Sequence, residues 1–359
     1  MTILHPTLRT MSQAMQPKLN RLKARMLSTG LTGGYTARFA WEEVLRAEES
    51  GNSTARVTEL IRASRWKASG PFNSLMFTLY CQTGDPIWLT AFVQEASVVL
   101  TQSQLSSEGA WMHSRGRYGD GFAVLIDSFQ EEASRLVKLA WLGRRGDRCD
   151  ISGDLPSSEA LEDMAVAQFQ MHRSILRDSE SGLWHNGRGW LTDPAELSPG
   201  FWSRGQGWLM RGLCETMQYL SRDAPRRETI TGLAQELAVS LLATQRENGM
   251  WPALLQVPES PPEASGSALI SGSLLLLMKM GLLDPAIYEE PVEASLHALL
   301  NDYLDEDGTV HNACPGPGPL VSMEAYQPGA SFPANEPHGI AAYLFLNRAL
   351  NAAVDPDCS

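Results

Sequence analysis

The chain has 359 residues, of which 43% are hydrophobic and 19% charged, with a formal net charge of -12 and a pI near 5.1. This composition excludes a disordered chain, because enough apolar side chain is present to bury a sizeable core. The acidic balance argues against general binding to nucleic acid, since it leaves no basic surplus to neutralise phosphates. An anionic small substrate stays compatible with it, because such a ligand needs only a locally basic pocket.

Several patterns of targeting and cofactor binding are missing from the sequence. The N-terminus has no apolar core of the length of a signal peptide, and no segment is apolar over the roughly 18 residues of a membrane span. The five cysteines are widely spaced and never form CxxC, and neither HExxH nor GxxxxGK[ST] occurs. We therefore expect a soluble cytoplasmic protein without a membrane partner, a metal or another cofactor.

Apolar residues recur at helical spacing along nearly the whole chain. Helices are expected over twelve segments: 8–27, 36–48, 53–64, 70–83, 86–104, 121–142, 157–177, 204–222, 226–244, 265–280, 285–304 and 338–353. No run shows the sustained alternation and hairpin turns of a large sheet. The sequence predicts an all-α protein, folded as a single domain over residues 1–359.

A weak repeat organises these segments. The phrases EGAWMHS, SGLWHNG, NGMWPAL and DGTVHNA each place a glycine two residues before an aromatic or apolar residue, at Gly109, Gly182, Gly249 and Gly308. Between the phrases stand turns that end helices, which is typical of a helical hairpin repeated around a ring. The glycine loops would then gather at one mouth, where their tryptophans, Trp111, Trp184 and Trp251, either line a ligand cavity or plug the loop ends.

The stretch FWSRGQGWLM, residues 201–210, has the strongest signal for a ligand site. Arg204 carries a planar fork that suits a carboxylate, and Trp202 or Trp208 offers a flat face for a sugar ring. The glycines at a helix entrance let the backbone approach a ligand. These residues suit an acidic carbohydrate, although core tryptophans and a structural ion pair of Arg204 would explain the same composition.

The motif Trp202-Ser203-Arg204-Gly205-Gln206-Gly207-Trp208 resembles the W-x-R-G-x-G-W signature of the unsaturated rhamnogalacturonyl and glucuronyl hydrolases of glycoside hydrolase families 105 and 88. Weaker matches follow in the same order, among them LIDSFQEEASRL, GMWPALLQVPE and NEPHGIAAYLFL. The resemblance covers most of residues 70–350 and implies an (α/α)6 barrel, a toroid of six helical hairpins. It also implies an enzyme that removes a 4,5-unsaturated uronic acid from an oligosaccharide by protonating a vinyl ether and adding water.

Asp127 takes the place of the catalytic aspartate in this resemblance. We expect it within an apolar helical face, where an unpaired carboxylate is costly to bury. Asp120 and Glu131 lie seven residues before and four after it, on about the same face of such a helix. Asp120 is a candidate second catalytic carboxyl, whereas Glu131 and Glu132 are expected to belong to a solvated charged stripe.

The resemblance departs at the second aspartate of the family, where this chain has Ala68, and residues 60–84 contain no acidic side chain. Three explanations stay open. Asp120 supplies the second carboxyl, or Asp127 acts alone with Lys67, Asn73 or His113 tuning its pKa, or the barrel isomerises, eliminates or cyclises a non-sugar metabolite. A noncatalytic binding toroid is a further alternative.

The substrate is expected to be a small molecule or oligosaccharide, anionic in character. The motif, the glycine loops and the final helix together supply nine candidate substrate-binding residues: Trp202, Arg204, Gln206, Trp208, His185, Trp184, His113, Trp251 and His338. The histidines are included because they can bind a carboxylate or carry protons. His185 lies in the most family-like region.

Overall fold

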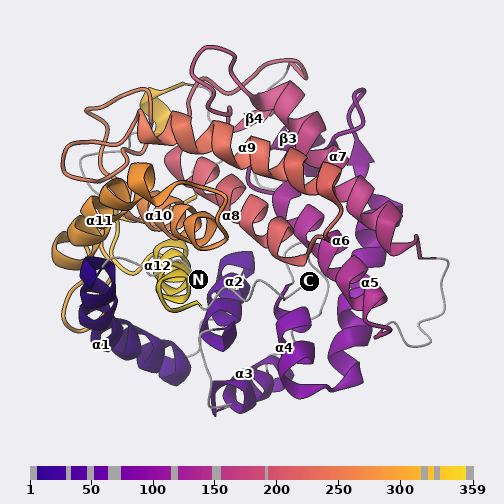
Figure 1. Ribbon diagram of the computed structural model, residues 1–359, viewed down its shortest axis with the longest axis horizontal. Coiled ribbons are helices and arrows are strands. Elements are labelled where there is room, and N and C mark those ends of the chain that lie inside the picture. Colours follow the sequence, from indigo (N-terminus) through magenta and orange to yellow (C-terminus); the bar gives the residue numbers. More distant parts are fainter. Residues whose placement is uncertain are drawn as a thin grey trace.

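The structure of the chain is a computed structural model, which describes residues 6–29, 34–46, 52–63, 74–114, 120–147, 155–190, 193–316, 322–326 and 332–352. Helices arranged around a central axis account for most of it (Figure 1). Within these ranges, no helix is both long and apolar enough to cross a membrane.

Twelve α-helices follow one another along the described chain and correspond one to one to the twelve expected segments. Their bounds are α1 Pro6–Thr29, α2 Gly34–Arg46, α3 Asn52–Ala63, α4 Leu75–Thr83, α5 Pro86–Gln102, α6 Phe129–Arg144, α7 Ser158–Leu176, α8 Ser203–Tyr219, α9 Ala224–Leu242, α10 Ala264–Lys279, α11 Pro285–Asp302 and α12 Pro337–Asn351. Acidic N-caps followed by proline begin α5, α11 and α12, because the carboxylate accepts free backbone N–H groups and proline is preset for the first turn.

The helices form an inner and an outer ring. Helix α8 packs against α6 and α10, and α12 closes the ring between α10 and α2. Nearly every residue of α8, α10 and α12 is buried, including polar ones, whereas α9 buries only one stripe. A helix buried on all faces must lie inside other helices. The expected (α/α)6 barrel is therefore confirmed.

A small sheet was not expected from the sequence. Four short antiparallel strands, β1 Gln104–Leu105, β2 Trp111–Ser114, β3 Phe122–Leu125 and β4 Gly187–Arg188, pair in the order β1-β2-β3-β4. Strand β3 occupies the first part of the segment expected as one helix over 121–142. The expectation that Asp127 lies inside a helix was therefore wrong: it follows the strand in a turn, and α6 begins two residues later.

The glycine loops join outer to inner helices and share one construction. All four glycines, Gly109, Gly182, Gly249 and Gly308, have φ between 73° and 89°, a left-handed backbone that glycine adopts without strain. Two residues after each glycine, the backbone N–H donates to a side-chain oxygen from another part of the chain. The four pairs are Trp111 to Gln168, Trp184 to Gln206, Trp251 to Ser267 and Val310 to Asn335. The sequence repeat thus corresponds to a structural repeat.

Acidic and basic side chains from four inner helices contact one another inside the ring. We call this the axial charge cluster, made of Glu42, Glu43 and Arg46 on α2, Glu131 and Lys138 on α6, Arg211 and Glu215 on α8, and Arg348 on α12. Glu215 contacts Arg46 at 2.6 Å and Arg348 at 3.0 Å. Burial opposes ionisation of Glu215, but the neighbouring cations outweigh it and lower its pKa.

The glycine loops make a specific stability prediction. A Cβ added at Gly249 would lie 2.4 Å from the backbone of Ala294, whereas one at Gly84 would meet nothing within 4 Å, and both glycines have positive φ. Gly84→Ala should therefore cost about 1–2 kcal/mol from backbone strain alone. Gly249→Ala should lose about 1–3 kcal/mol more from the collision. Urea unfolding of both variants checks this, and equal losses would contradict the close packing of the loop.

Candidate active site

The starts of four inner helices lie together at one end of the barrel. Arg204, in the first turn of α8, contacts Ser265 in the first turn of α10. It also lies near Gly316 and His338, the latter in the first turn of α12. The charge of Arg204 acts on Asp127, in the turn that precedes α6. Because helix N-termini carry partial positive charge and free N–H groups, their convergence favours an anionic ligand.

Asp127 is held in its turn by its neighbours on both sides. The backbone N–H of Ile126 donates to the carbonyl of Asn186, and the Ser128 hydroxyl lies 3.2 Å from Oδ1 of Asp127. Burial raises the pKa of Asp127, opposed by the Ser128 hydrogen bond and by the charge of Arg204. A carboxyl group with a raised pKa keeps its proton at pH values where an ordinary aspartate has lost it. Such a group can act as a general acid.

Arg204 is completely buried and only partly paired. Its Nη1 donates to the Ser265 hydroxyl at 3.1 Å and to the carbonyl of Cys314, and lies 3.9 Å from Glu263. The guanidinium also stands over the Trp202 ring, 4.4 Å from its centroid. Its Nε and Nη2 have no hydrogen-bond partner among the described residues. Two buried donors are thus open to a ligand oxygen.

The glycines of the motif serve helix packing. A Cβ at Gly205 would lie 3.0 Å from Ile126, beside Asp127, and one at Gly207 would lie 2.7 Å from Leu269 on α10. A Cβ at Gly266 of α10 would lie 2.8 Å from the backbone nitrogen of Arg204. We expected these glycines to admit a ligand, but they instead bring α8 against the Asp127 turn and α10. This close approach sets Arg204 beside both.

His338 forms a pair with Glu336, the N-cap of α12. Its Nδ1 lies 2.8 Å from the Glu336 carboxylate, which also accepts the His338 backbone N–H at 2.7 Å. Burial and the charge of Arg204 lower the pKa of His338 to about 4, although Glu336 opposes this. Burial raises the pKa of Glu336, but His338 and Arg204 outweigh it and the net shift is downward. The imidazole is therefore neutral near pH 7.

A second buried imidazole–carboxyl pair joins β2 to α6. His113 on β2 has its Nε2 3.7 Å from Glu132, and neither atom has a hydrogen-bond partner within the described residues. Burial raises the pKa of Glu132 to about 7 and lowers that of His113 to about 4. The expectation of a solvated stripe was wrong for both glutamates, because Glu131 is also buried and pairs with Arg211.

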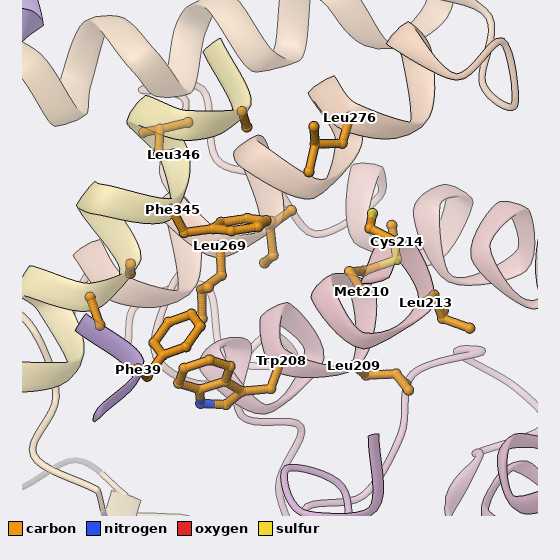
Figure 2. Packing of buried hydrophobic residues seen from close by; sticks show 14 of the residues in the cluster. Phe39, Trp208, Leu209, Met210, Leu213, Cys214, Leu269, Leu276, Phe345 and Leu346 are labelled. Carbon is orange, nitrogen blue, oxygen red and sulfur yellow. The ribbon is translucent and has the colours of Figure 1, made fainter. Parts of the chain in front are cut away.

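Four of the expected ligand-binding residues have structural contacts instead. The Gln206 amide bonds both the N–H and the carbonyl of Trp184, so its donor and acceptor are used. Trp184 and Trp251 are almost fully buried, and the Trp251 indole donates to the Leu241 carbonyl at 2.8 Å. Trp208 packs against Phe39, with 4.8 Å between ring centroids, in the apolar core (Figure 2). The tryptophans therefore plug their loops.

Other predicted residues differ in their position. His185 is partly exposed, with Nδ1 2.7 Å from the Ser198 carbonyl and its ring against Phe201, just ahead of α8. Asp120 lies on an exposed bend before β3, at the opposite end of that strand from Asp127. The two aspartates do not share a helix face. Ala68, Lys67 and Asn73 fall outside the described residues.

Sequence reasoning missed three acidic residues of this region: Glu263, Glu336 and Glu132. Glu263 caps α10, accepting from Ser265 and Gly266, and also accepts the Cys314 N–H at 2.9 Å. The Glu-Pro pair at the start of α12 was a detectable N-cap signal for Glu336. Glu132 gave no such signal, because the spacing of residues along its own helix does not reveal that His113 on strand β2 lies beside it.

Comparison with known proteins agrees with this architecture. Residues 153–349, more than half of the chain, match the family model of Glycosyl Hydrolase Family 88. The unsaturated rhamnogalacturonyl hydrolase YesR of Bacillus subtilis is 26% identical over 258 residues, which cover 71% of this chain and 68% of YesR.

Solved structures share the fold. A family 105 glycoside hydrolase of C. acetobutylicum has a TM-score of 0.75 at 18% identity, over 92% of this chain and 98% of that one. The unsaturated glucuronyl hydrolase of Bacillus sp. GL1 has a TM-score of 0.68 at 17% identity, over 94% and 96%.

These findings define a glycoside hydrolase of the six-hairpin barrel class, which acts in carbohydrate chemistry. The chain belongs to Glycosyl Hydrolase Family 88.

The structural role of Gln206 can be tested by truncation. Gln206→Ala leaves two buried backbone groups of Trp184 unpaired, at a cost of about 1–3 kcal/mol for each. We expect a lower unfolding free energy with little change of KM in the folded protein. A raised KM at unchanged stability would instead return Gln206 to the substrate site.

Proposed function

We propose that this enzyme removes a 4,5-unsaturated uronic acid from the end of an oligosaccharide. One observation carries the proposal: Asp127, whose burial favours its protonated form, lies within the field of Arg204, a buried arginine whose Nε and Nη2 have no hydrogen-bond partner in the described part of the chain. The site thus combines an acid with a receptor for a carboxylate. Family membership and the printed activity of YesR support the same reaction class.

The substrate carries a vinyl ether, in which the ring oxygen feeds electron density through C5 to C4. The Asp127 carboxyl donates its proton to C4, and the positive charge left at C5 is stabilised by the ring oxygen. Water adds to C5 and gives a hemiketal. Opening of the ring then leaves a hemiacetal at C1, which releases the rest of the oligosaccharide. The reaction needs one acid of raised pKa and no metal step.

Arg204 would bind the C6 carboxylate of the uronate through Nε and Nη2. A guanidinium offers parallel donors to a carboxylate, and charged hydrogen bonds of this kind are the strong ones in proteins. The Trp202 ring lies against the guanidinium, with 4.4 Å between its centroid and Cζ of Arg204. The unfilled donors explain how a net acidic protein can bind an acidic sugar.

Asp127→Asn tests the acid. The amide cannot supply the proton, so kcat on unsaturated glucuronyl or galacturonyl disaccharides should fall by about 10²–10⁴-fold. Loss of the ultraviolet absorbance of the conjugated double bond measures turnover. In the wild-type enzyme the rate should fall as pH rises through the raised pKa of Asp127, because only the protonated form donates.

Asp120→Asn is the matched control, and its exposed position predicts wild-type turnover. Full activity in Asp127→Asn would exclude the catalytic assignment. No turnover of any such disaccharide by the folded wild type would favour a repurposed barrel acting on a non-sugar metabolite.

Arg204→Lys tests carboxylate binding. Lysine keeps the charge but lacks the planar fork, so KM should rise about tenfold or more, equivalent to about 1.4 kcal/mol. Arg188→Lys is the control, because Arg188 pairs with Glu108 in an exposed ion pair on β4. An unchanged KM in Arg204→Lys would argue against this arginine as the carboxylate receptor.

A further inference from the structure

Asn186 contacts both halves of the proposed site. It is almost fully buried and comes just before β4. Its backbone carbonyl accepts the N–H of Ile126, the residue before Asp127, at 3.1 Å. Its side-chain Oδ1 would lie 3.5 Å from a Cβ built on Gly205, the residue after Arg204. Asn186 therefore reaches the turn of the acid with its backbone and the first turn of α8 with its side chain.

The side chain of Asn186 bonds Tyr326, which ends the short 3₁₀ helix Glu324–Tyr326. Nδ2 of Asn186 donates to the Tyr326 hydroxyl at 3.3 Å. The ring of Tyr326 packs with Trp202 in a small buried apolar cluster. The other contact of the Trp202 ring is the guanidinium of Arg204, at 4.4 Å. The hydroxyl of Tyr326 is thus linked to the acid, and its ring is linked to the carboxylate receptor.

Further contacts hold the 3₁₀ helix against the segment that precedes α8. The N–H of Tyr326 donates to the Met323 carbonyl at 3.1 Å, and the sulfur of Met323 lies 3.3 Å from the amide nitrogen of Gln256. The same amide donates to the Pro199 carbonyl at 3.2 Å, and its oxygen accepts the Phe201 N–H at 3.0 Å. The Tyr326 ring is therefore held in place by contacts that do not involve its hydroxyl.

We propose that Asn186 and Tyr326 are positioning residues that hold the acid and the carboxylate receptor at a fixed separation. This inference rests on the proposed function, in which Asp127 protonates C4 while Arg204 binds the carboxylate attached to C5. These two carbons are bonded to each other, so a shift of one side chain relative to the other misplaces the proton. Asn186 acts through the turn before α6. Tyr326 acts through Asn186 and through Trp202.

The hydroxyl and the ring of Tyr326 predict different kinetic effects, measured with the full-length enzyme on unsaturated glucuronyl and galacturonyl disaccharides. Tyr326→Phe removes the bond to Asn186 and leaves the ring against Trp202. We expect kcat to fall by about 10- to 100-fold with KM little changed, because a misplaced acid slows the chemical step. Tyr326→Ala also removes the ring beside Trp202, so KM should rise as well.

The pH profile gives a second readout. Within the described chain, the charge that acts on Asp127 is that of Arg204 from α8, and the Ser128 hydroxyl bonds its carboxyl. Burial raises the pKa of Asp127, so a loosened turn that admits water should lower that pKa. The loss of activity at high pH should therefore begin at lower pH in Tyr326→Phe than in the wild type. A loss of global stability alone would not move this limb.

A double-mutant cycle tests whether the Tyr326 hydroxyl acts through Asn186. Asn186→Ala keeps the backbone carbonyl but removes the amide, so its kcat should fall at least as far as that of Tyr326→Phe. The double variant should be no slower than Asn186→Ala alone, because the hydroxyl has already lost its partner. Losses that add up in the double variant would contradict the coupling.

Tyr343→Phe is the matched control, since the Tyr343 hydroxyl is also buried and donates to the Leu299 carbonyl at 3.0 Å, between α12 and α11. It should lose a similar amount of stability in urea while kcat, KM and the pH profile stay as in the wild type. Wild-type kcat and an unmoved alkaline limb in Tyr326→Phe would overturn the positioning role and leave the proposed function intact. Absence of turnover by the folded wild type would overturn both.

Discussion

The buried guanidinium of Arg204 is the interaction on which the site depends. Removing a charge from water costs several kcal/mol unless partners compensate it. Here the compensation is partial within the described residues, because Glu263 lies 3.9 Å away, Ser265 and a carbonyl accept from one nitrogen, and Nε and Nη2 have no hydrogen-bond partner there. A carboxylate bound to these two nitrogens would complete the pairing, which is why the proposed function assigns them to an anionic substrate.

The axial charge cluster joins α6, α8 and α12, three of the inner helices whose starts form the mouth. Its four carboxylates, Glu42, Glu43, Glu131 and Glu215, face four cations, Arg46, Lys138, Arg211 and Arg348, so the buried charges balance. Most of these pairs join different inner helices, whereas Arg46 and Glu42 pair within α2, and loss of one partner would leave another group buried and unpaired. Arg204 and Trp208 lie four residues apart on α8, between the mouth and this cluster.

Much of the fold could be predicted, for physical reasons. Helical apolar spacing located all twelve helices, and the glycines of the repeat marked positions that need a left-handed backbone. The sheet was not predicted because its strands have only two to four residues. Over so few residues, the alternation of apolar and polar side chains in a strand cannot be distinguished from helical spacing. That omission also placed Asp127 inside a helix, although it follows a strand. The residue was identified by its resemblance, and its catalytic role stays a prediction.

The sequence by itself determined the helices, the repeated loops, and the presence of Arg204 and His338 near helix starts, but it placed Asp127 inside a helix. Only the tertiary structure decided which polar residues have atoms left for a ligand. Arg204 and Gln206 are two residues apart and equally buried, yet the glutamine amide bonds Trp184 at both ends while, among the described residues, two nitrogens of the arginine have no hydrogen-bond partner. Helix periodicity predicts on which side of its helix each residue lies. The groups that face this side come from distant parts of the chain, and they determine which donors keep no partner.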